Sequence, residues 1–178
     1  MQYTTKYIRR IREIFLGLIE DLSIEQLNEI PAGFNNNIVW NFGHIITSTT
    51  ALCYISSGVD KHADNPYFDK YKKGTRPESF ITEEELNDLK RLAFANLDKI
   101  ESDLAANRFE QIQPFATGTF KYEMHSIEEV LTCATAHESL HLGIANAIKK
   151  LVTSDYYKQQ TQTNLNLENL KSQISNLS

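Results

Sequence analysis

Apolar residues recur at intervals of three and four along four long segments of this chain, residues 3–21, 37–57, 82–104 and 126–152. This spacing gives a helix one continuous apolar stripe, which is the pattern of helices that pack against one another. The 178 residues include only seven Gly and four Pro, too few for the many tight turns of a sandwich or a barrel. The sequence therefore predicts an all-α protein whose architecture is a four-helix bundle.

The first segment shows how each stripe is assigned. Ile8, Ile11 and Phe15 form its apolar side. Its charged residues are expected on the solvent side, because charged side chains are rarely buried without partners. These charged residues are Arg9, Arg10, Arg12 and Glu13.

The third and fourth segments each begin with a capping box, in which two side chains satisfy each other's backbone amides at the start of a helix. Thr82 and Glu85 open the third segment, and Ser126 and Glu129 open the fourth. Gly58 can close the second segment, since glycine tolerates the left-handed backbone that ends many helices. These signals predict where the long helices begin and end.

We place one bundle domain at residues 1–153, because a chain of this length usually builds a single core. The tail of residues 154–178 is rich in Gln and Asn, and apolar residues from Leu167 onward permit one short extra helix. Residues 58–81 form a long loop, and loops of this length often contribute to binding sites. The aromatic side chains of this loop either fold over a cavity or pack the loop against the bundle.

The net charge of −5 gives no general attraction to nucleic acid. Residues 38–59 lack Asp, Glu, Lys and Arg, but Asn41, His44 and several Ser and Thr favour a buried bundle helix over a membrane span. Cys53 and Cys133 do not form a disulfide framework, and the first residues lack the apolar run of a signal peptide. We therefore expect a cytoplasmic protein without nucleic-acid or membrane partners.

Residues 137–141 read His-Glu-Ser-Leu-His and lie inside the fourth helical segment. Because a helix rises about 5.4 Å per turn, His137 and His141 project from one face and can bind the same metal ion. His44 lies in the uncharged second segment, where a buried imidazole requires partners for its ring nitrogens. These three residues are candidate ligands of one divalent metal ion. The coordination positions that they leave open are typical of catalytic sites.

Glu138 makes the same stretch match the His-Glu-x-x-His motif of zinc proteases, in which the glutamate activates a water molecule. Because Glu138 also falls on the apolar stripe, it is either a catalytic general base or a buried packing partner that supports the site. The protease hypothesis is the weaker one, since the longer form of the motif requires Gly and His where this chain has Ile144 and Ala147. Cys133, one turn before His137, either approaches the metal or fills core space.

Residues 40–45 (Trp-Asn-Phe-Gly-His-Ile) and residues 137–143 (His-Glu-Ser-Leu-His-Leu-Gly) resemble motifs of the DinB/YfiT-like superfamily, and the likeness covers about residues 5–152. It implies an up-down-down-up bundle that binds a divalent metal ion, often zinc or nickel, through three histidines. It also implies frequent homodimers and the chemistry of thiol-dependent S-transferases or isomerases. Ile144 departs from the pattern, since many relatives have Gln there, which leaves the ligands intact but removes a polar contact to substrate.

Two functions are consistent with these residues. In the first, His44, His137 and His141 hold a divalent metal ion, zinc or nickel, that activates a low-molecular-weight thiol or a water for attack on a small-molecule substrate. Such an enzyme is a transferase or a hydrolase. In the second, the protein is a non-catalytic module of the stress response that binds a metal or a ligand.

Overall fold

The computed structural model describes residues 2–154, together with residues 163, 166–167, 171 and 173. The predicted extra helix in the tail of residues 154–178 therefore lies almost entirely outside the described residues. The description that follows concerns residues 2–154, which contain all the segments that the sequence assigns to the bundle.

The long helices occupy the segments that the apolar spacing predicts. They are α1 (Gln2–Ile19), α3 (Ile38–Thr50) with its continuation η1 (Ala51–Ser56), α5 (Glu83–Ala105) and α6 (Ile127–Val152). Both α1 and α3 contact α5 and α6, so these helices enclose one interior. The predicted all-α class is confirmed, while the up-down-down-up order of helix directions stays a prediction.

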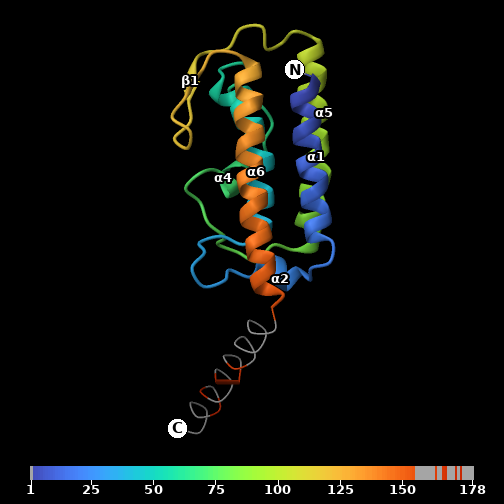
Figure 1. Cartoon of the computed structure of the whole chain (residues 1–178), viewed down its shortest axis with the longest axis vertical. Coiled ribbons are helices and arrows are strands. Elements are labelled where there is room, and N and C mark those ends of the chain that lie inside the picture. The colour runs from blue at the N-terminus through green and yellow to red at the C-terminus, as the bar shows by residue number, and fades with distance from the viewer. Residues whose placement is uncertain (1, 155–162, 164–165, 168–170, 172, 174–178) are drawn as a thin grey trace.

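Shorter elements connect the long helices along the chain. Helix α2 (Ile24–Asn28) follows α1, and helix α4 (Phe68–Tyr71) interrupts the long loop. Strand β1 (Phe115–Ala116) pairs antiparallel with β2 (Glu123–Met124), with Phe115 opposite Met124. In Figure 1, α4 and the hairpin of β1 and β2 lie on one side of α6, and α1 and α5 lie on the other side. The loop and the hairpin are therefore the segments that can cover the surface of α6 facing away from α1 and α5.

Helix α3 is the most enclosed helix, as its lack of charge predicts. Every residue of α3 except Ser48 is buried. Asn37 caps it, because its side chain accepts a hydrogen bond of 2.8 Å from the backbone amide of Trp40. Across the described part of the chain, no helix combines the length and the apolar character needed to cross a bilayer. The uncharged stretch is thus a bundle helix, as expected from its polar residues.

The end of this helix differs from the regular helix predicted for residues 37–57. Residues Ala51–Ser56 form a π-helix, in which backbone hydrogen bonds join residues five apart instead of four and the turn is wider. Such turns are rare and often occur at functional sites. Here Ala51, Leu52 and Ser56 border the large cavity described below. The widened turn therefore shapes one wall of that cavity.

The core between the helices is built from the predicted apolar stripes. One cluster of buried residues includes Phe15 and Phe42, whose ring centroids lie 5.1 Å apart. A second cluster includes Ile8 and Leu131. Full burial of such a side chain contributes about 1.5–3 kcal/mol relative to exposure. The side chains of Ile8, Ile11 and Phe15 are buried as predicted.

The prediction that Arg12 faces solvent is wrong, because the Arg12 side chain is 0% exposed. Its Nη2 donates a hydrogen bond of 2.6 Å to Oε1 of Glu138, and its Nε lies 3.2 Å from both carboxylate oxygens. Nη1 donates to the backbone carbonyl of Ala93. The Thr49 hydroxyl donates a further bond of 2.7 Å to Glu138. These four residues come from α1, α6, α5 and α3, so one buried polar network joins all four long helices.

Candidate metal centre

The structure brings the three predicted histidines together. His44 on α3 faces His137 and His141 on α6, and one nitrogen from each ring lies within 4.8 Å of the others. The ring centroid of His44 is 5.1 Å from that of His137 and 4.6 Å from that of His141. The two rings on α6 are 4.6 Å apart. Three nitrogens gathered at this spacing can share a single cation.

The position of His44 is fixed by a backbone carbonyl and by an aromatic ring. Its Nδ1 forms a hydrogen bond with the carbonyl oxygen of Tyr71. Because a carbonyl only accepts, Nδ1 must carry the proton, and Nε2 keeps its lone pair. The indole of Trp40 stacks on the imidazole with centroids 4.7 Å apart and an interplanar angle of 11°. His44 therefore presents one unprotonated nitrogen in a fixed orientation.

Gly43 allows Tyr71 to come close enough for this contact. A Cβ at position 43 would lie 2.7 Å from carbons of the Tyr71 ring, so only glycine leaves room for it. Tyr71 is fully buried, and its hydroxyl donates a hydrogen bond of 2.7 Å to Glu85. Burial, then the bond to Glu85, raises the pKa of Tyr71. The ring is thus locked, and its backbone carbonyl is held at His44.

His141 is oriented by a side-chain amide. Its Nδ1 lies 2.7 Å from Oδ1 of Asn41. The other end of that amide donates a bond of 2.7 Å to the carbonyl of Asn37, which assigns Oδ1 to the histidine side. Nδ1 of His141 therefore carries the proton and Nε2 is free to act as a ligand. This chain of contacts connects the cap of α3 to the site.

His137 differs from the other two histidines. Its Nδ1 is buried and has no hydrogen-bond partner within the described part of the chain. A buried polar atom without a partner costs about 1–3 kcal/mol, and such atoms are rare in folded proteins. A cation bound through this Nδ1 would offset a cost of this kind. The donor set, three imidazoles of which two have their second nitrogen already hydrogen-bonded, fits a divalent metal ion.

The electrostatic environment keeps the three rings neutral at pH 7. Burial lowers the pKa of His44. Burial, and then the neighbouring His44, lowers the pKa of His137 to about 4. Burial, His44 and His137 together lower the pKa of His141 to about 3. Neutral imidazole is the form that binds metal, so no proton has to be displaced at neutral pH.

The histidines border a cavity of about 630 Å³, within the size range of small-molecule sites. Its walls come from α3, η1, α6, the loop around α4 and the β1–β2 hairpin. The apolar side chains of the wall include Leu52, Phe68, Phe115, Phe120, Leu140 and Ile144. Of the aromatic residues predicted to fold over a cavity or pack on the bundle, Phe68 borders the cavity and Tyr71 packs into the core. Phe80 is exposed.

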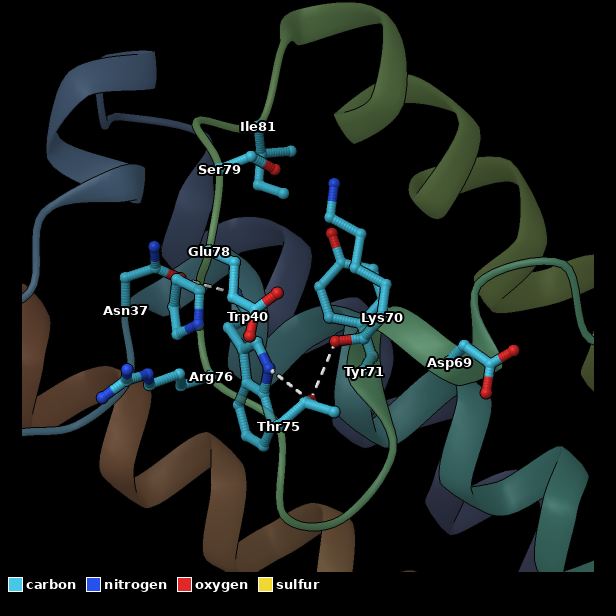
Figure 2. Close-up of a pocket in the computed structure, with 11 residues that line it drawn as sticks. Asn37, Trp40, Asp69, Lys70, Tyr71, Thr75, Arg76, Glu78, Ser79 and Ile81 are labelled. Atoms are coloured by element: carbon cyan, nitrogen blue, oxygen red, sulfur yellow. Dashed lines mark hydrogen bonds between the residues drawn. The ribbon is translucent and has the colours of Figure 1, made fainter.

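A second cavity of about 430 Å³ lies on the loop side of Trp40 (Figure 2). Trp40 borders both cavities. Its Nε1 donates a bond of 3.2 Å to the Thr75 hydroxyl, which in turn donates one of 2.8 Å to the Lys70 carbonyl. The loop therefore holds the indole in place, and the indole holds the His44 ring from its flat side.

Glu138 and Cys133 flank His137 but differ in surroundings. Glu138 is completely buried, is held by Arg12 and Thr49, and is not one of the described residues that line the cavity. Its contacts support the role of a packing partner, and a catalytic role stays a prediction. Cys133 is half-buried and borders the cavity, and burial raises the pKa of its thiol. It is not part of the group of three histidines that could hold a metal ion.

The sequence does not predict the two groups that orient the histidines. Asn41 gives one indication, because an amide in an otherwise apolar helix must find partners when it is buried. Tyr71 gives none, because it acts through its backbone carbonyl, which every residue has. Arg12 has a weak indication in its spacing, four residues after Ile8 and three before Phe15, on the buried stripe.

Comparison with known proteins concerns the fold and the family of this chain. A solved structure of a conserved protein from Enterococcus faecalis superimposes with a TM-score of 0.55 at 16% identity, covering 85% of this chain and 95% of that one. This likeness concerns the fold alone. No curated protein matches the sequence. The model of the DinB superfamily matches residues 7–145, which include all three histidines and most of the bundle. The chain belongs to the DinB superfamily.

Proposed function

We propose that this protein is a metal-dependent enzyme in which His44, His137 and His141 hold one divalent ion, zinc or nickel. The observation that carries the proposal is the convergence of their nitrogens, within 4.8 Å of one another, at the wall of a 630 Å³ cavity. When bound, such an ion lowers the pKa of a thiol or a water and so provides a nucleophile at neutral pH. Imidazole ligands suit both metals.

The residues around the histidines would prepare the site for a small organic substrate. Asn41 and the Tyr71 carbonyl hold two rings in the tautomer that leaves Nε2 available. The apolar wall excludes water from part of the cavity, which strengthens electrostatic interactions inside it. Three protein ligands leave positions for a substrate or a thiol cosubstrate. Transfer of a low-molecular-weight thiol is our first choice of reaction, and hydrolysis is the second.

The zinc-protease alternative lacks support from the residues around the motif. The glutamate that activates water in those enzymes corresponds to Glu138, whose carboxylate is bound by Arg12 and Thr49. The described residues contain one sheet, formed by two strands of two residues each, which offers little edge for a peptide substrate. We therefore do not propose proteolysis.

The metal content of purified protein tests the proposal. We expect about one equivalent of zinc or nickel per chain in the wild type and almost none in the His137→Ala/His141→Ala double variant. His125→Ala is the matched control, because His125 is exposed and outside the cluster. Equal metal content in all three proteins would contradict the metal site.

Catalysis requires a separate measurement. Metal-loaded protein should turn over at least one pair from a panel of thiols and electrophiles, and His44→Ala should abolish this turnover. Tight metal binding without any turnover across the panel would favour the alternative, a non-catalytic metal- or ligand-binding module.

We also propose that the protein acts as a cytoplasmic homodimer. The support for a dimer is a row of partly exposed apolar side chains on α6: Leu140 (50% exposed) and Ile144 (39% exposed), which also border the large cavity, and Leu151 (38% exposed). Apolar surface of this kind often marks an interface. Light scattering coupled to gel filtration tests it, and a monomeric mass at micromolar concentration would contradict it.

A further inference from the structure

The charge of the large cavity differs from that of the whole protein. The chain carries a net charge of −5. Among the described residues that line the cavity, none is Asp or Glu, and two are lysines, Lys72 and Lys73. The three histidines add no negative charge. A ligand in this cavity therefore meets two lysines and no carboxylate from the residues that line it.

The two lysines are not equivalent. Lys72 forms an ion pair of 2.7 Å with Asp69 and lies over the ring of Phe68, 5.9 Å from its centroid. Lys73 has no carboxylate partner among the residues that the structure describes. Its ammonium group lies against Gly118, where a Cβ would be only 2.4 Å from Nζ. Lys73 thus extends from the loop to the hairpin, and its charge remains available to a ligand.

The remaining wall is mainly apolar, and its side chains come from elements on different sides of the cavity. Phe115 and Phe120 come from the hairpin region, Leu52 from η1, and Leu140 from α6. Ser48, Ser56, Thr117 and Thr119 also border the cavity. The apolar part of a ligand, enclosed by these side chains, can therefore lie between the histidines and the lysines at positions 72 and 73.

We propose that the cavity selects amphipathic organic anions, with an apolar body against the aromatic and aliphatic wall and a carboxylate, sulfonate or phosphate beside Lys73. The inference rests on the proposed function, because it names the substrate class of that same site. Electrostatic complementarity of this kind selects between ligands of similar shape, since a neutral analogue gains the apolar contacts but not the charge contact.

A pair of fluorescent probes separates the two contributions. 8-Anilinonaphthalene-1-sulfonate carries a sulfonate on an apolar body, and N-phenyl-1-naphthylamine is the same body without it. We expect wild-type protein to bind the sulfonate more tightly, and Lys73→Gln to weaken sulfonate binding by about threefold to tenfold. Binding of the neutral probe should change by less than about twofold.

Two further variants serve as matched controls. Lys72→Gln should weaken sulfonate binding less than Lys73→Gln does, because Asp69 already neutralises Lys72. Lys61→Gln, which removes the same charge outside the cavity, should leave both affinities unchanged. Equal losses in all three variants would show a general charge effect and would overturn the proposal. Wild-type protein that binds neither probe, or binds both equally, would overturn it as well.

The same samples distinguish this inference from the metal proposal. Neither probe needs a metal ion, so the titrations are run on metal-free protein and repeated after zinc is added, with metal content measured in parallel. A normal metal content in Lys73→Gln with unchanged sulfonate affinity overturns the anion selectivity alone. If Lys73→Gln lowers the affinity for the sulfonate and neither this variant nor the wild type takes up zinc, the result supports the anion selectivity and contradicts the metal centre.

Discussion

His137 and Glu138 are adjacent in the sequence, yet they lie in opposite surroundings. His137 borders the large cavity and has a buried nitrogen without a partner in the described part of the chain. Glu138 is 0% exposed and binds Arg12 and Thr49 in the middle of the bundle. Successive residues of an α-helix point about 100° apart, which is enough to separate a site from a core. Within one five-residue motif, one face of the helix therefore carries the candidate metal ligands, and the other face holds the helices together.

The two regions also differ in their electrostatics. The Glu138 region encloses a full negative and a full positive charge, each with hydrogen bonds to further groups. The histidine region encloses neutral rings whose protonation is suppressed by burial. Removing one member of a buried ion pair leaves an uncompensated charge, whereas removing a neutral ring leaves mainly space. Substitutions in the two regions should therefore produce different kinds of loss.

The largest effect is expected for Glu138→Ala. This change leaves the Arg12 guanidinium buried without its carboxylate, and we expect the free energy of unfolding to fall by about 3–5 kcal/mol. Urea denaturation of metal-free protein measures it. In contrast, His137→Ala should change the stability of metal-free protein by less than about 1 kcal/mol while abolishing metal binding.

A double variant controls for the possibility that Glu138→Ala does not fold. Arg12→Met/Glu138→Leu replaces the ion pair by apolar side chains of similar size, and such replacements are often neutral or stabilising. We expect this protein to recover most of the lost stability and to retain its metal. If it folds but loses turnover, Glu138 belongs to the reaction, and the division between the two faces is wrong.

A second prediction concerns Asn41, the residue that orients His141. Asn41→Ala removes the amide that orients His141 at 2.7 Å, and loss of such a partner typically weakens metal binding by about 10-fold to 100-fold. Competition with a chromogenic chelator measures the affinity. Thr50→Ala is a control on the same helix, because the Thr50 hydroxyl bonds the carbonyl of Ile46 and not a histidine. Equal affinities in the wild type and Asn41→Ala would show that His141 needs no such support.

Much of this arrangement follows from the sequence, and the reasons are specific. The positions of the long helices follow from apolar spacing, since each buried stripe must contact another helix. The convergence of His44, His137 and His141 follows from helical spacing and from the enclosure of an uncharged helix. The capping box at Ser126 forms as predicted, with Glu129 reaching back to the backbone.

The features that sequence reasoning missed depend on contacts between distant segments. Arg12 lies on the buried stripe by spacing, but its charge favours exposure until its partner Glu138, 126 residues away, is known. The carbonyl of Tyr71 reaches His44 only because of how the loop packs on Gly43. A backbone group carries no sequence signature, so this contact needs the three-dimensional structure.

A third prediction uses pH to compare the two regions. Unfolded histidines have a pKa of about 6.5, and in the fold the pKa is about 4 for His137 and about 3 for His141. Below pH 6.5 the unfolded chain therefore binds more protons than the folded one, and stability falls as the pH falls. We expect each of these two histidines to cost metal-free protein about 2 kcal/mol of stability between pH 7 and pH 5.

Urea denaturation at pH 7, 6 and 5 measures this dependence. His137→Ala should show a shallower slope, because one of the suppressed titrations is gone. Arg12→Met/Glu138→Leu should keep the wild-type slope between these pH values, since its histidines are unchanged. Equal slopes in the wild type and His137→Ala would mean that the histidines do not govern acid stability.

The smallest effect is expected for Cys133→Ala, which tests whether the metal ligands of α6 include a residue beyond His137 and His141. Cys133, His137 and His141 follow one another at intervals of four, so helical spacing alone would place all three at the metal. The structure groups only the two histidines of α6 with His44, and it leaves the half-buried thiol at the cavity wall with a raised pKa. We therefore expect unchanged metal content and a stability loss below about 1 kcal/mol.

Cobalt-substituted protein provides a sharper measurement, because a thiolate ligand adds a charge-transfer band in the near ultraviolet. If that band is present in the wild type and absent in Cys133→Ala, the ligand face extends one turn further than the three histidines.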